Sequence, residues 1–144
     1  TALFGNGGND TMTGGSGNDL LLVGGSGNTT LTGNAGADVF KWTQSASGST
    51  TITDFGKAQG DVLNIQNLLS GVNLTSANLN QYLSLSASGQ DASIKVYNGT
   101  GAFGSDATKL MSITLSGAYT DVRGSATSDA LALQALIDQR VIQT

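Results

Sequence analysis

Apolar residues follow two different patterns along this chain, and the change comes near residue 41. Upstream, single large apolar side chains recur every nine or ten residues within stretches of Gly, Asn, Ser and Thr; they are Leu3, Met12, Leu21, Leu31 and Phe40. Downstream, apolar and polar residues alternate at period two in 82–86, 92–97 and 110–115. The first pattern predicts stacked repeats and the second predicts strands with one buried face.

The upstream pattern resolves into four repeat units of nine residues, at 5–13, 14–22, 24–32 and 33–41. Each approximates G-G-x-G-x-D-x-U-x, where U is the large apolar residue. The glycine-rich part predicts a tight turn, because such turns need positive φ, and the last three residues predict a short strand whose middle side chain points inward. A flexible Gly/Ser/Asn linker is the alternative, but it would not space apolar residues so regularly. One unit cannot bury its apolar residue alone, so we expect stacking.

Aspartate occupies the sixth position of three units, as Asp10, Asp19 and Asp38, and Thr29 occupies it in the third unit. No lysine or arginine precedes Lys41, so the protein supplies no side-chain counter-charge there. Carboxylate and carbonyl oxygens brought together by tight turns suit a hard cation, and we therefore predict bound Ca²⁺. The turn residues predicted to contribute to these sites are Gly5, Gly8, Gly14, Ser16, Gly17, Gly25, Gly27, Asn34 and Gly36.

After the repeats, the sequence predicts a polar connector over 41–51 and two short strands around a loop in 52–65. Trp42 is expected to cap the apolar row of the repeat, with sugar binding as the alternative. Asp54 and Asp61 lie in the loop with Gly56 and Gly60 between them. They are read either as a further Ca²⁺ site or as ordinary turn-forming aspartates, and the residues leave both open.

The rest of the chain predicts a small sheet with helices. A turn and a short helix beginning at Thr75 or Ser76 are expected in 67–81, and a hairpin link at 88–91. The loop 98–108 is glycine-rich but lacks the apolar repeat position. The C-terminal segment predicts a helix capped by Ser128, whose apolar stripe comprises Leu133, Leu136, Ile137 and Val141.

Composition narrows the function further. The net charge is −4, with ten Asp and no Glu, and no basic stripe exists to bind nucleic acid. The absence of His and Cys excludes histidine and thiol catalysis and the usual zinc ligands. No apolar run approaches the ~20 residues that a membrane span needs, so no stable membrane insertion is expected. The chain begins inside a repeat without Met, which suggests a C-terminal piece of a longer protein.

The repeats are followed by I-T-D-F…G-D-V-L-N-I, then N-L-N-Q-Y-L, S-I-K-V and a terminal L-I-D. This arrangement resembles the C-terminal end of RTX proteins exported by type I secretion systems, most closely that of large bacterial adhesins. The resemblance implies a mainly all-β fold: a right-handed parallel β-roll over 1–41, with two units per turn, and a sheet or sandwich-like cap with a short helix over 42–144. It also implies a monomer with an uncleaved C-terminal secretion signal, carrying no catalytic residues.

The partners implied are an ATP-binding-cassette exporter, a membrane-fusion protein and an outer-membrane channel. The location implied is outside a Gram-negative cell or on its surface. Ca²⁺ would lie between unit n and unit n+2, which pairs Asp19 with Asp38 in a complete site and Asp10 with Thr29 in a weaker one. Asp54 and Asp61 match the family's D-F…G-x-D segment. Val23, one residue beyond the nine, is expected to form a bulge or a widened turn.

Two other functions remain open from the sequence. The chain could be a sugar- or ice-binding tip, using Trp42, Tyr97, Tyr119 and the loop 98–108. An ice-binding face would need threonines ranked at a fixed repeat position, whereas the linear sequence has only scattered ones. Alternatively, the chain could be the tail of a secreted protease or lipase; it contains neither HExxH nor GxSxG, so catalysis would lie upstream.

Overall fold

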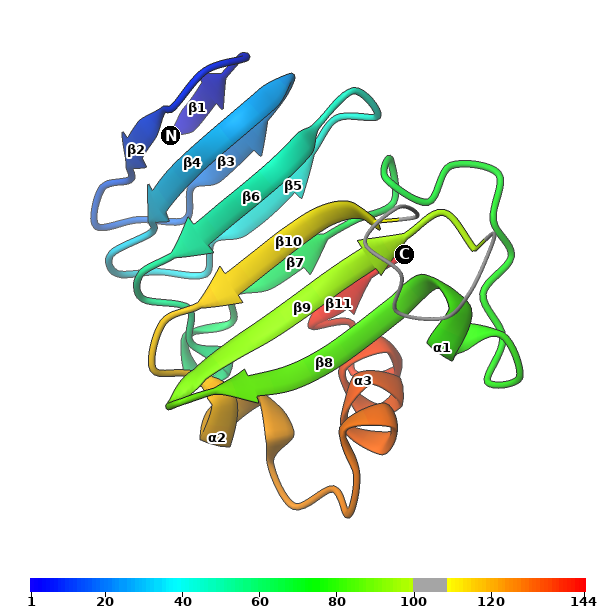
Figure 1. Ribbon diagram of the computed structural model, residues 1–144. Helices are drawn as coiled ribbons and strands as arrows, with labels where there is room; N and C mark the ends of the chain where they lie inside the picture. Colours follow the sequence, from blue (N-terminus) through cyan, green and yellow to red (C-terminus); the bar gives the residue numbers. More distant parts are fainter. Residues whose placement is uncertain (100–108) are drawn as a thin grey trace.

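The computed structural model describes residues 1–99 and 109–144, which form two facing β-sheets (Figure 1). Sheet A has the strand order β1-β3-β5-β7-β11 and sheet B the order β2-β4-β6-β10-β9-β8. Up to β7, successive strands alternate between the sheets, so the chain winds as a flattened coil. The coil strands are β1 (Ala2–Gly5), β2 (Thr11–Thr13), β3 (Leu20–Val23), β4 (Ser26–Thr32), β5 (Val39–Trp42), β6 (Ser47–Ile52) and β7 (Val62–Asn64).

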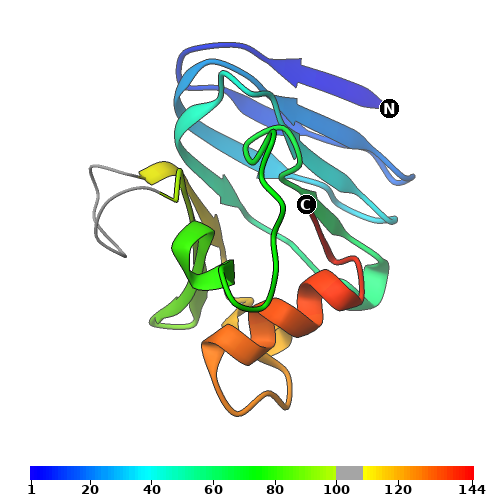
Figure 2. The same ribbon diagram turned by 90° about the vertical axis from the view of Figure 1, so that its right-hand side faces the viewer.

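All pairs between these coil strands are parallel, and each strand stacks on the strand of the next coil (Figure 2). Leu21 pairs with Phe40 in sheet A, and Leu31 pairs with Met12 and Ile52 in sheet B. The inward apolar residues therefore form two columns, one from each sheet. This confirms the predicted parallel β-roll with two units per turn and stacking of unit n on unit n+2.

Val23 does not form the predicted bulge or widened turn. It is buried in β3 and pairs with Gly5 on one side and Trp42 on the other, with no break in the ladder. The extra residue lengthens the strand, and β1 and β5 also have four residues. A β-branched apolar side chain gains more from a strand position facing the core than from a turn.

The predicted connector over 41–51 is also wrong, because β6 occupies most of its second half. β6 pairs with β4 from Ser26–Ser47 through to Leu31–Ile52, so residues 45–53 repeat the register of 24–32. In the same way, the pairing of Val39 with Val62 places residues 56–64 in register with 33–41. The coil thus continues for two units past Lys41, with most of the characteristic glycines replaced.

The C-terminal part extends both sheets. β10 (Lys109–Leu115) joins β6 in parallel, and the hairpin of β8 (Leu83–Ser88) and β9 (Asp91–Tyr97) continues sheet B antiparallel, as the period-two segments predicted. β11 (Ile142–Gln143) pairs with β7 at the end of sheet A and was not predicted. A 3₁₀ turn, η1 (Lys57–Gln59), lies before β7.

Three short helices accompany this extension. α1 (Leu79–Tyr82) begins at Leu79 instead of at Thr75 or Ser76, and α2 (Tyr119–Arg123) was not predicted. α3 (Asp129–Asp138) begins as predicted, with the Ser128 hydroxyl accepting a hydrogen bond from the Leu131 N–H at 3.2 Å. Its stripe is shorter than expected, because Val141 lies beyond the helix end. Figure 2 shows α3 packed across the end of the coil.

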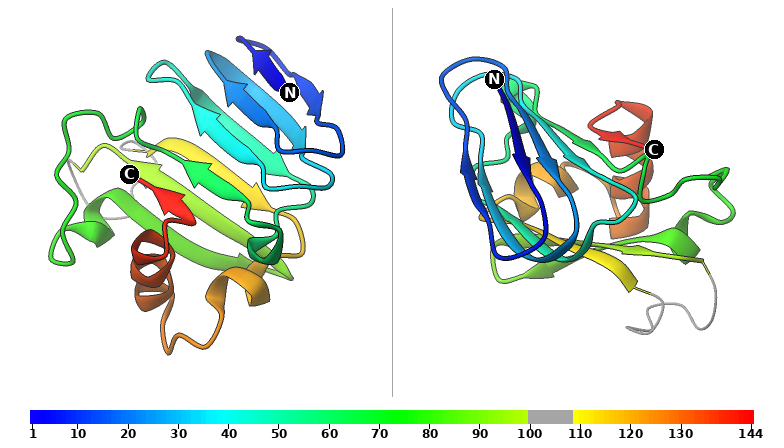
Figure 3. Two further views of the ribbon diagram at one scale, coloured as in Figure 1. Left: turned by 180° about the vertical axis from the view of Figure 1, so that it is seen from behind. Right: turned by 90° about the horizontal axis from the view of Figure 1, so that it is seen from above.

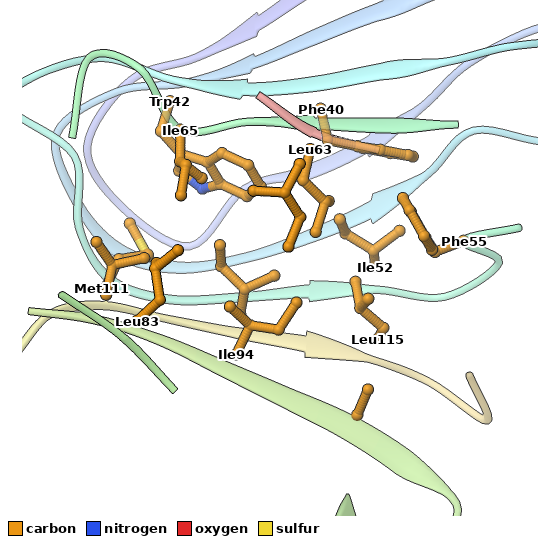
Figure 4. Packing of buried hydrophobic residues seen from close by; sticks show 14 of the residues in the cluster. Phe40, Trp42, Ile52, Phe55, Leu63, Ile65, Leu83, Ile94, Met111 and Leu115 are labelled. Atoms are coloured by element: carbon orange, nitrogen blue, oxygen red, sulfur yellow. The ribbon is translucent and has the colours of Figure 1, made fainter. Parts of the chain in front are cut away.

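The core lies between the two sheets and is continuous from the coil into the cap. In Figure 4, Trp42, Phe40, Leu63 and Ile65 come from the sheet A side and meet Ile52, Met111, Ile94 and Leu115 from sheet B. Trp42 is fully buried, and its indole N–H donates to the Thr50 hydroxyl at 3.0 Å. Trp42 therefore packs against the apolar row of the repeat, which agrees with the capping interpretation and not with sugar binding.

Most of the predicted glycine loop, from residue 100 to 108, lies outside the described residues. Among the residues that are described, no helix is both long and apolar enough to cross a membrane.

Candidate metal centre

The turns of the coil lie along two opposite edges, as the view from above makes clear (Figure 3). The turns that lead from sheet B to sheet A carry Asp19, Asp38 and Asp61, each just before a strand of sheet A; we call this the aspartate edge. On the opposite edge the corresponding positions, before the inward residue of each sheet B strand, hold Asp10, Thr29 and Thr50; we call this the threonine edge. Stacking therefore gathers the predicted ligands into two separate rows.

Hydrogen bonds between successive coils order the aspartate edge. The backbone N–H of Asp19 donates to Asp38 Oδ1 at 2.9 Å, and the N–H of Asp38 donates to Asp61 Oδ1 at 3.0 Å. The second oxygens of Asp19 and Asp61 accept from Gly15 N–H at 2.6 Å and Gly56 N–H at 2.9 Å. Asp38 Oδ2 is buried and has no hydrogen-bond partner among the described residues. The structure thus brings Asp19 next to Asp38, as predicted, and adds Asp61 to the same row.

Asp54 joins this row from the turn that follows β6. Its Oδ1 accepts from Gly33 N–H at 2.9 Å and its Oδ2 from Asn34 N–H at 2.7 Å, both in the turn of the preceding coil. Asp54 and Asp61 thus lie in the last turn of the aspartate edge, and both contact the turn that contains Asp38. Asp54 therefore stabilises a turn by hydrogen bonds, but this turn belongs to the preceding coil and not to its own.

The row concentrates negative charge in a buried place. Asp19, Asp38 and Asp61 are 4 %, 0 % and 2 % exposed. Among the described residues, the α-amino group of Thr1, 2.6 Å from Asp19, is the only cationic group that pairs with any of them. Burying carboxylates without partners is costly, and that cost falls when a cation binds between them.

The pKa values of two of these carboxyls depart from the ordinary range in opposite directions. Burial raises the pKa of Asp61, and the nearby charges of Asp38 and Asp54 add to the effect. The hydrogen bond from the Thr1 amino group lowers the pKa of Asp19, as does the bond from Gly15 N–H. A carboxyl like Asp61, with neighbouring negative charge and no cation, is the kind of group that a metal ion would stabilise in its charged form.

The threonine edge changes character along its length. Asp10 Oδ2 is buried without a partner, and Thr29, the predicted weak position, is buried beside it in the next coil. In the third coil the corresponding residue is Thr50, which is fully buried. Its hydroxyl oxygen accepts the hydrogen bond of the Trp42 indole N–H, so this position is used inside the core. Carboxylate ligands are therefore present only at the first coil of this edge.

Glycine keeps the turns narrow enough for neighbouring coils to approach. A Cβ on Gly36, where φ is +123°, would lie 2.6 Å from the Gly17 carbonyl oxygen, and one on Gly14 would lie 2.7 Å from the Gly33 carbonyl oxygen. Carbonyls therefore line the space between stacked turns. The described residues contain no group of three or more acidic, His or Cys side chains arranged around one metal position. A metal here must combine carboxylate with backbone oxygens, a donor set that fits Ca²⁺.

The remaining predicted turn residues lie on both edges, and several already use a backbone oxygen. The carbonyls of Gly5, Gly14 and Gly25 accept hydrogen bonds from Gly24 N–H, the Asn34 amide and Ser47 N–H. Such a carbonyl retains a second lone pair for a metal. The other predicted contributors are Gly8, in a turn of the threonine edge, Gly27, near the start of β4 beside it, and Ser16, Gly17 and Gly36 in turns of the aspartate edge.

Sequence reasoning missed the asparagines at the fifth position of the repeat. Asn9 Oδ1 accepts from Asn28 N–H at 3.0 Å, and Asn18 Oδ1 accepts from Ala37 N–H at 2.8 Å, 19 residues further along in both cases. Each amide thus ties one turn to the turn stacked on it. The recurrence of Asn directly before Asp was the signal that could have identified them.

The outer face of sheet B corrects the expectation of scattered threonines. Strand pairing aligns Thr11, Thr30, Thr51 and Thr114 in one rank across four strands, and Ser93 and Ser86 continue it across the next two. A second rank contains Thr13, Thr32 and Thr53. No helix lies over this face, which is turned toward the viewer in Figure 1.

The aromatic residues proposed for a ligand-binding tip are not available for that role. Trp42 and Tyr97 are buried, and the half-buried Tyr119 donates its hydroxyl hydrogen to Asp129 at 2.7 Å. They provide no exposed stacking platform for a sugar.

The repeat segment matches a known family of repeats. Residues 3–21 and 22–41 match the family model of the RTX calcium-binding nonapeptide repeat. The solution structure of the AlgE6R3 subunit of the Azotobacter vinelandii mannuronan C5-epimerase is similar over 84 % of this chain and 83 % of that one, with 20 % identity and a TM-score of 0.44. None of the curated proteins compared matches the sequence. Residues 3–41 therefore match RTX calcium-binding repeats, and the carboxylate and carbonyl donors described above fit the Ca²⁺ that the family model names.

Proposed function

We propose that this chain is a calcium-dependent folding module that becomes ordered only after export from the cell. One observation carries the proposal: three buried carboxylates, Asp19, Asp38 and Asp61, are stacked on neighbouring coils, and within residues 1–99 and 109–144 no lysine or arginine pairs with them. Such a row is unfavourable in the folded state until a cation binds. Calcium then favours the folded chain, because the unfolded chain does not hold the carboxylates together.

The expected energies are large enough for a switch. One site at a hundredfold excess of calcium over its Kd adds about 2.7 kcal/mol to the free energy of unfolding. Domains of this size have total stabilities of about 5–15 kcal/mol. With extracellular sites binding at about 10⁻⁴–10⁻³ M, the chain would remain unfolded in calcium-poor cytosol and fold outside. An export channel requires the unfolded form.

A calcium titration of the whole chain, followed by far-ultraviolet circular dichroism, tests the switch. We expect a disordered spectrum in metal-stripped buffer and a strand spectrum at millimolar calcium. Magnesium at the same concentration serves as the control, because it prefers a strict octahedral site and keeps its waters. A chain equally folded in excess chelator would refute the proposal.

The finer proposal is that the chain ends a large RTX adhesin of a Gram-negative bacterium and carries its type I secretion signal without catalytic residues. The resemblance of the segments after residue 52 supports this, and α3 is the candidate element for recognition by the exporter. Leu131 on α3 is 56 % exposed and is therefore accessible to a partner. Neither HExxH nor GxSxG occurs in these 144 residues.

Export of a fused reporter tests the signal. Deleting 128–144 would remove α3 and β11, which close the core, so loss of export could reflect misfolding. Leu131→Ser is a sharper variant, because it changes an exposed residue and should reduce export while leaving calcium-induced folding intact. Leu133→Ser is the matched control: Leu133 is buried, so this variant shows what a folding defect alone does to export. Normal export of Leu131→Ser would exclude this residue from recognition.

The ranked hydroxyls on sheet B favour a second candidate function, binding to ice. Ranks on neighbouring strands are about 4.8 Å apart and alternate residues along a strand about 6.7 Å apart, a regular array of hydroxyl and methyl groups. The two ranks contain no carboxylate, although the protein is acidic.

Partition of the calcium-loaded chain into growing ice tests this candidate function. Thr30→Lys should abolish incorporation if the face binds, and Thr120→Lys, at an exposed position outside the ranks, should not. Exclusion of the unsubstituted chain from ice would reject this function.

A further inference from the structure

A small cavity lies where the last coil meets the C-terminal helices. Its volume is about 190 Å³, and it is bounded by Lys57 from the turn after β6, by the α2–α3 link at Arg123–Ala126, and by one side of α3. On the α3 side Ala132 and Ala135 leave room that larger side chains would fill. The cavity is separate from the aspartate edge, although Lys57 belongs to the same turn as Asp54 and Asp61.

The residues around this cavity carry unusual charge for this protein. The chain has only six lysines and arginines, and two of them, Lys57 and Arg123, line the cavity, whereas no aspartate does. The Lys57 ammonium reaches the link, since a Cβ on Gly124 would lie 3.9 Å from Lys57 Nζ. The nearby carboxylate of Asp121 accepts from the backbone N–H of Lys57 at 3.1 Å. Two cationic side chains thus border one pocket, with the Asp121 carboxylate next to Lys57 and Asp129 paired with Arg123.

Arg123 is held in place but incompletely bonded. Its Nη1 donates to Tyr119 Oη at 2.9 Å and to Asp129 Oδ1 at 3.1 Å, which fixes the guanidinium. Among the described residues its Nε is buried without an acceptor. A guanidinium has five N–H donors, so Arg123 is fixed beside the cavity and keeps donor capacity beyond its bonds to Tyr119 and Asp129.

We propose that this cavity binds a small oxyanion of the sulfate or phosphate class. The ammonium of Lys57 and the guanidinium of Arg123 would neutralise it, and the Ser125 hydroxyl and the Gln139 amide are further hydrogen-bond donors at the cavity. Arginine and lysine are the usual residues for such groups. Because the ligand would touch the last coil, the α2–α3 link and α3 together, it would fasten the helices to the coil. The proposal does not depend on export or on the ice-binding candidate.

Sulfate is a suitable probe, because phosphate would precipitate calcium. The calcium-saturated chain would be titrated with sodium sulfate against sodium chloride at equal ionic strength, and amide resonances followed by nuclear magnetic resonance. We expect saturable shifts confined to Lys57, Gly124, Ser125 and the facing side of α3. Shifts that are absent, equal in chloride, or spread over the surface without saturation would overturn the site.

A pair of variants with the same charge change separates specific binding from general salt effects. Lys57→Gln should weaken sulfate binding at least fivefold, whereas Lys95→Gln, on the outer face of β9, should leave it unchanged. Sulfate stabilises folded proteins generally, so the rise in melting temperature common to both variants is subtracted. An equal loss of binding in both variants, or in neither, would contradict the proposal. The calcium titration of each variant gives an independent measure of folding.

Discussion

Asp38 is a buried carboxylate in contact with the coils on both sides of its own. It is fully buried, its Oδ1 accepts the N–H of Asp19, its own N–H donates to Asp61, and its Oδ2 has no partner. It therefore participates in contacts with the coil on each side. Asp10, in contrast, has the hydroxyl of Thr29 as its neighbour in the next coil instead of a second carboxylate.

This difference predicts unequal effects of removing single carboxylates. Asp38→Asn should raise the calcium concentration at half-folding at least tenfold, because calcium affinity falls when a charged ligand is removed and this residue borders two gaps between coils. Asp10→Asn should raise this calcium concentration less than about threefold, because the threonine edge has no second carboxylate next to Asp10. Calcium titration by circular dichroism compares the two. A larger effect at Asp10 would reverse the assignment of strong and weak edges.

The raised pKa of Asp61 predicts how the calcium-free chain responds to pH. The folded state binds the proton more tightly than the unfolded chain, in which an aspartate titrates near pH ~3.9. This contribution to stability is present below that value and is lost as pH rises through the folded pKa. Circular dichroism in metal-stripped buffer should therefore show the folded fraction falling as pH rises over that window, and Asp61→Asn should flatten the fall.

Saturating calcium should remove the Asp61 effect near neutral pH, because the metal favours the charged carboxylate. The same pH series in saturating calcium, again followed by circular dichroism, is the control. If the slope with pH is the same for Asp61→Asn and the unsubstituted chain in metal-stripped buffer, Asp61 is not the titrating group.

At the scale of elements, tight stacking depends on turn glycines that are not equivalent. Gly36 has φ +123°, and a Cβ there would approach the Gly17 carbonyl at 2.6 Å, whereas a Cβ on Gly17 would meet nothing within 4 Å. Gly36→Ala should lower the free energy of unfolding in calcium by about 2 kcal/mol, through backbone strain and separation of the coils. Gly17→Ala should change it by less than about 0.5 kcal/mol. Urea denaturation measures both, and equal losses would contradict this account of the stack.

How far the elements could be predicted depends on whether the signal was local. The nine-residue period identified β2 to β5 and the stacking of Asp19 on Asp38, because turn chemistry and apolar spacing lie within each unit. Units 45–53 and 56–64 were missed because serine, alanine, lysine and glutamine replace their glycines, and only the pairing of Ile52 and Leu63 with earlier coils identifies them. The two-residue β11 depends on a distant partner and has no local signal.

The whole molecule passes from a coil rich in carboxylates to a cap held by apolar contacts. Around the first coils the buried side chains include Asp19, Thr29 and Asp38, whereas the cap buries residues such as Leu83, Ile94 and Ile113. Partial removal of calcium should therefore loosen the coil before the cap. Hydrogen exchange during chelator titration should show the amides of β2 to β5 losing protection at higher free calcium than those of β8 to β10. Simultaneous loss everywhere would mean that coil and cap unfold as one unit.

The coils also become longer toward the C-terminus. In sheet A, Ala2 pairs with Leu20, 18 residues on, Leu20 with Val39, 19 residues on, and Val39 with Val62, 23 residues on. Identical repeats could align with one another in several ways, and each misalignment would satisfy many of the same contacts. With unequal circumferences, a coil shifted by one place has a turn of the wrong length and sets Trp42 against the wrong neighbours. The irregular repeat thus specifies a single alignment of the stack, which protects a tandem sequence against slippage as it folds.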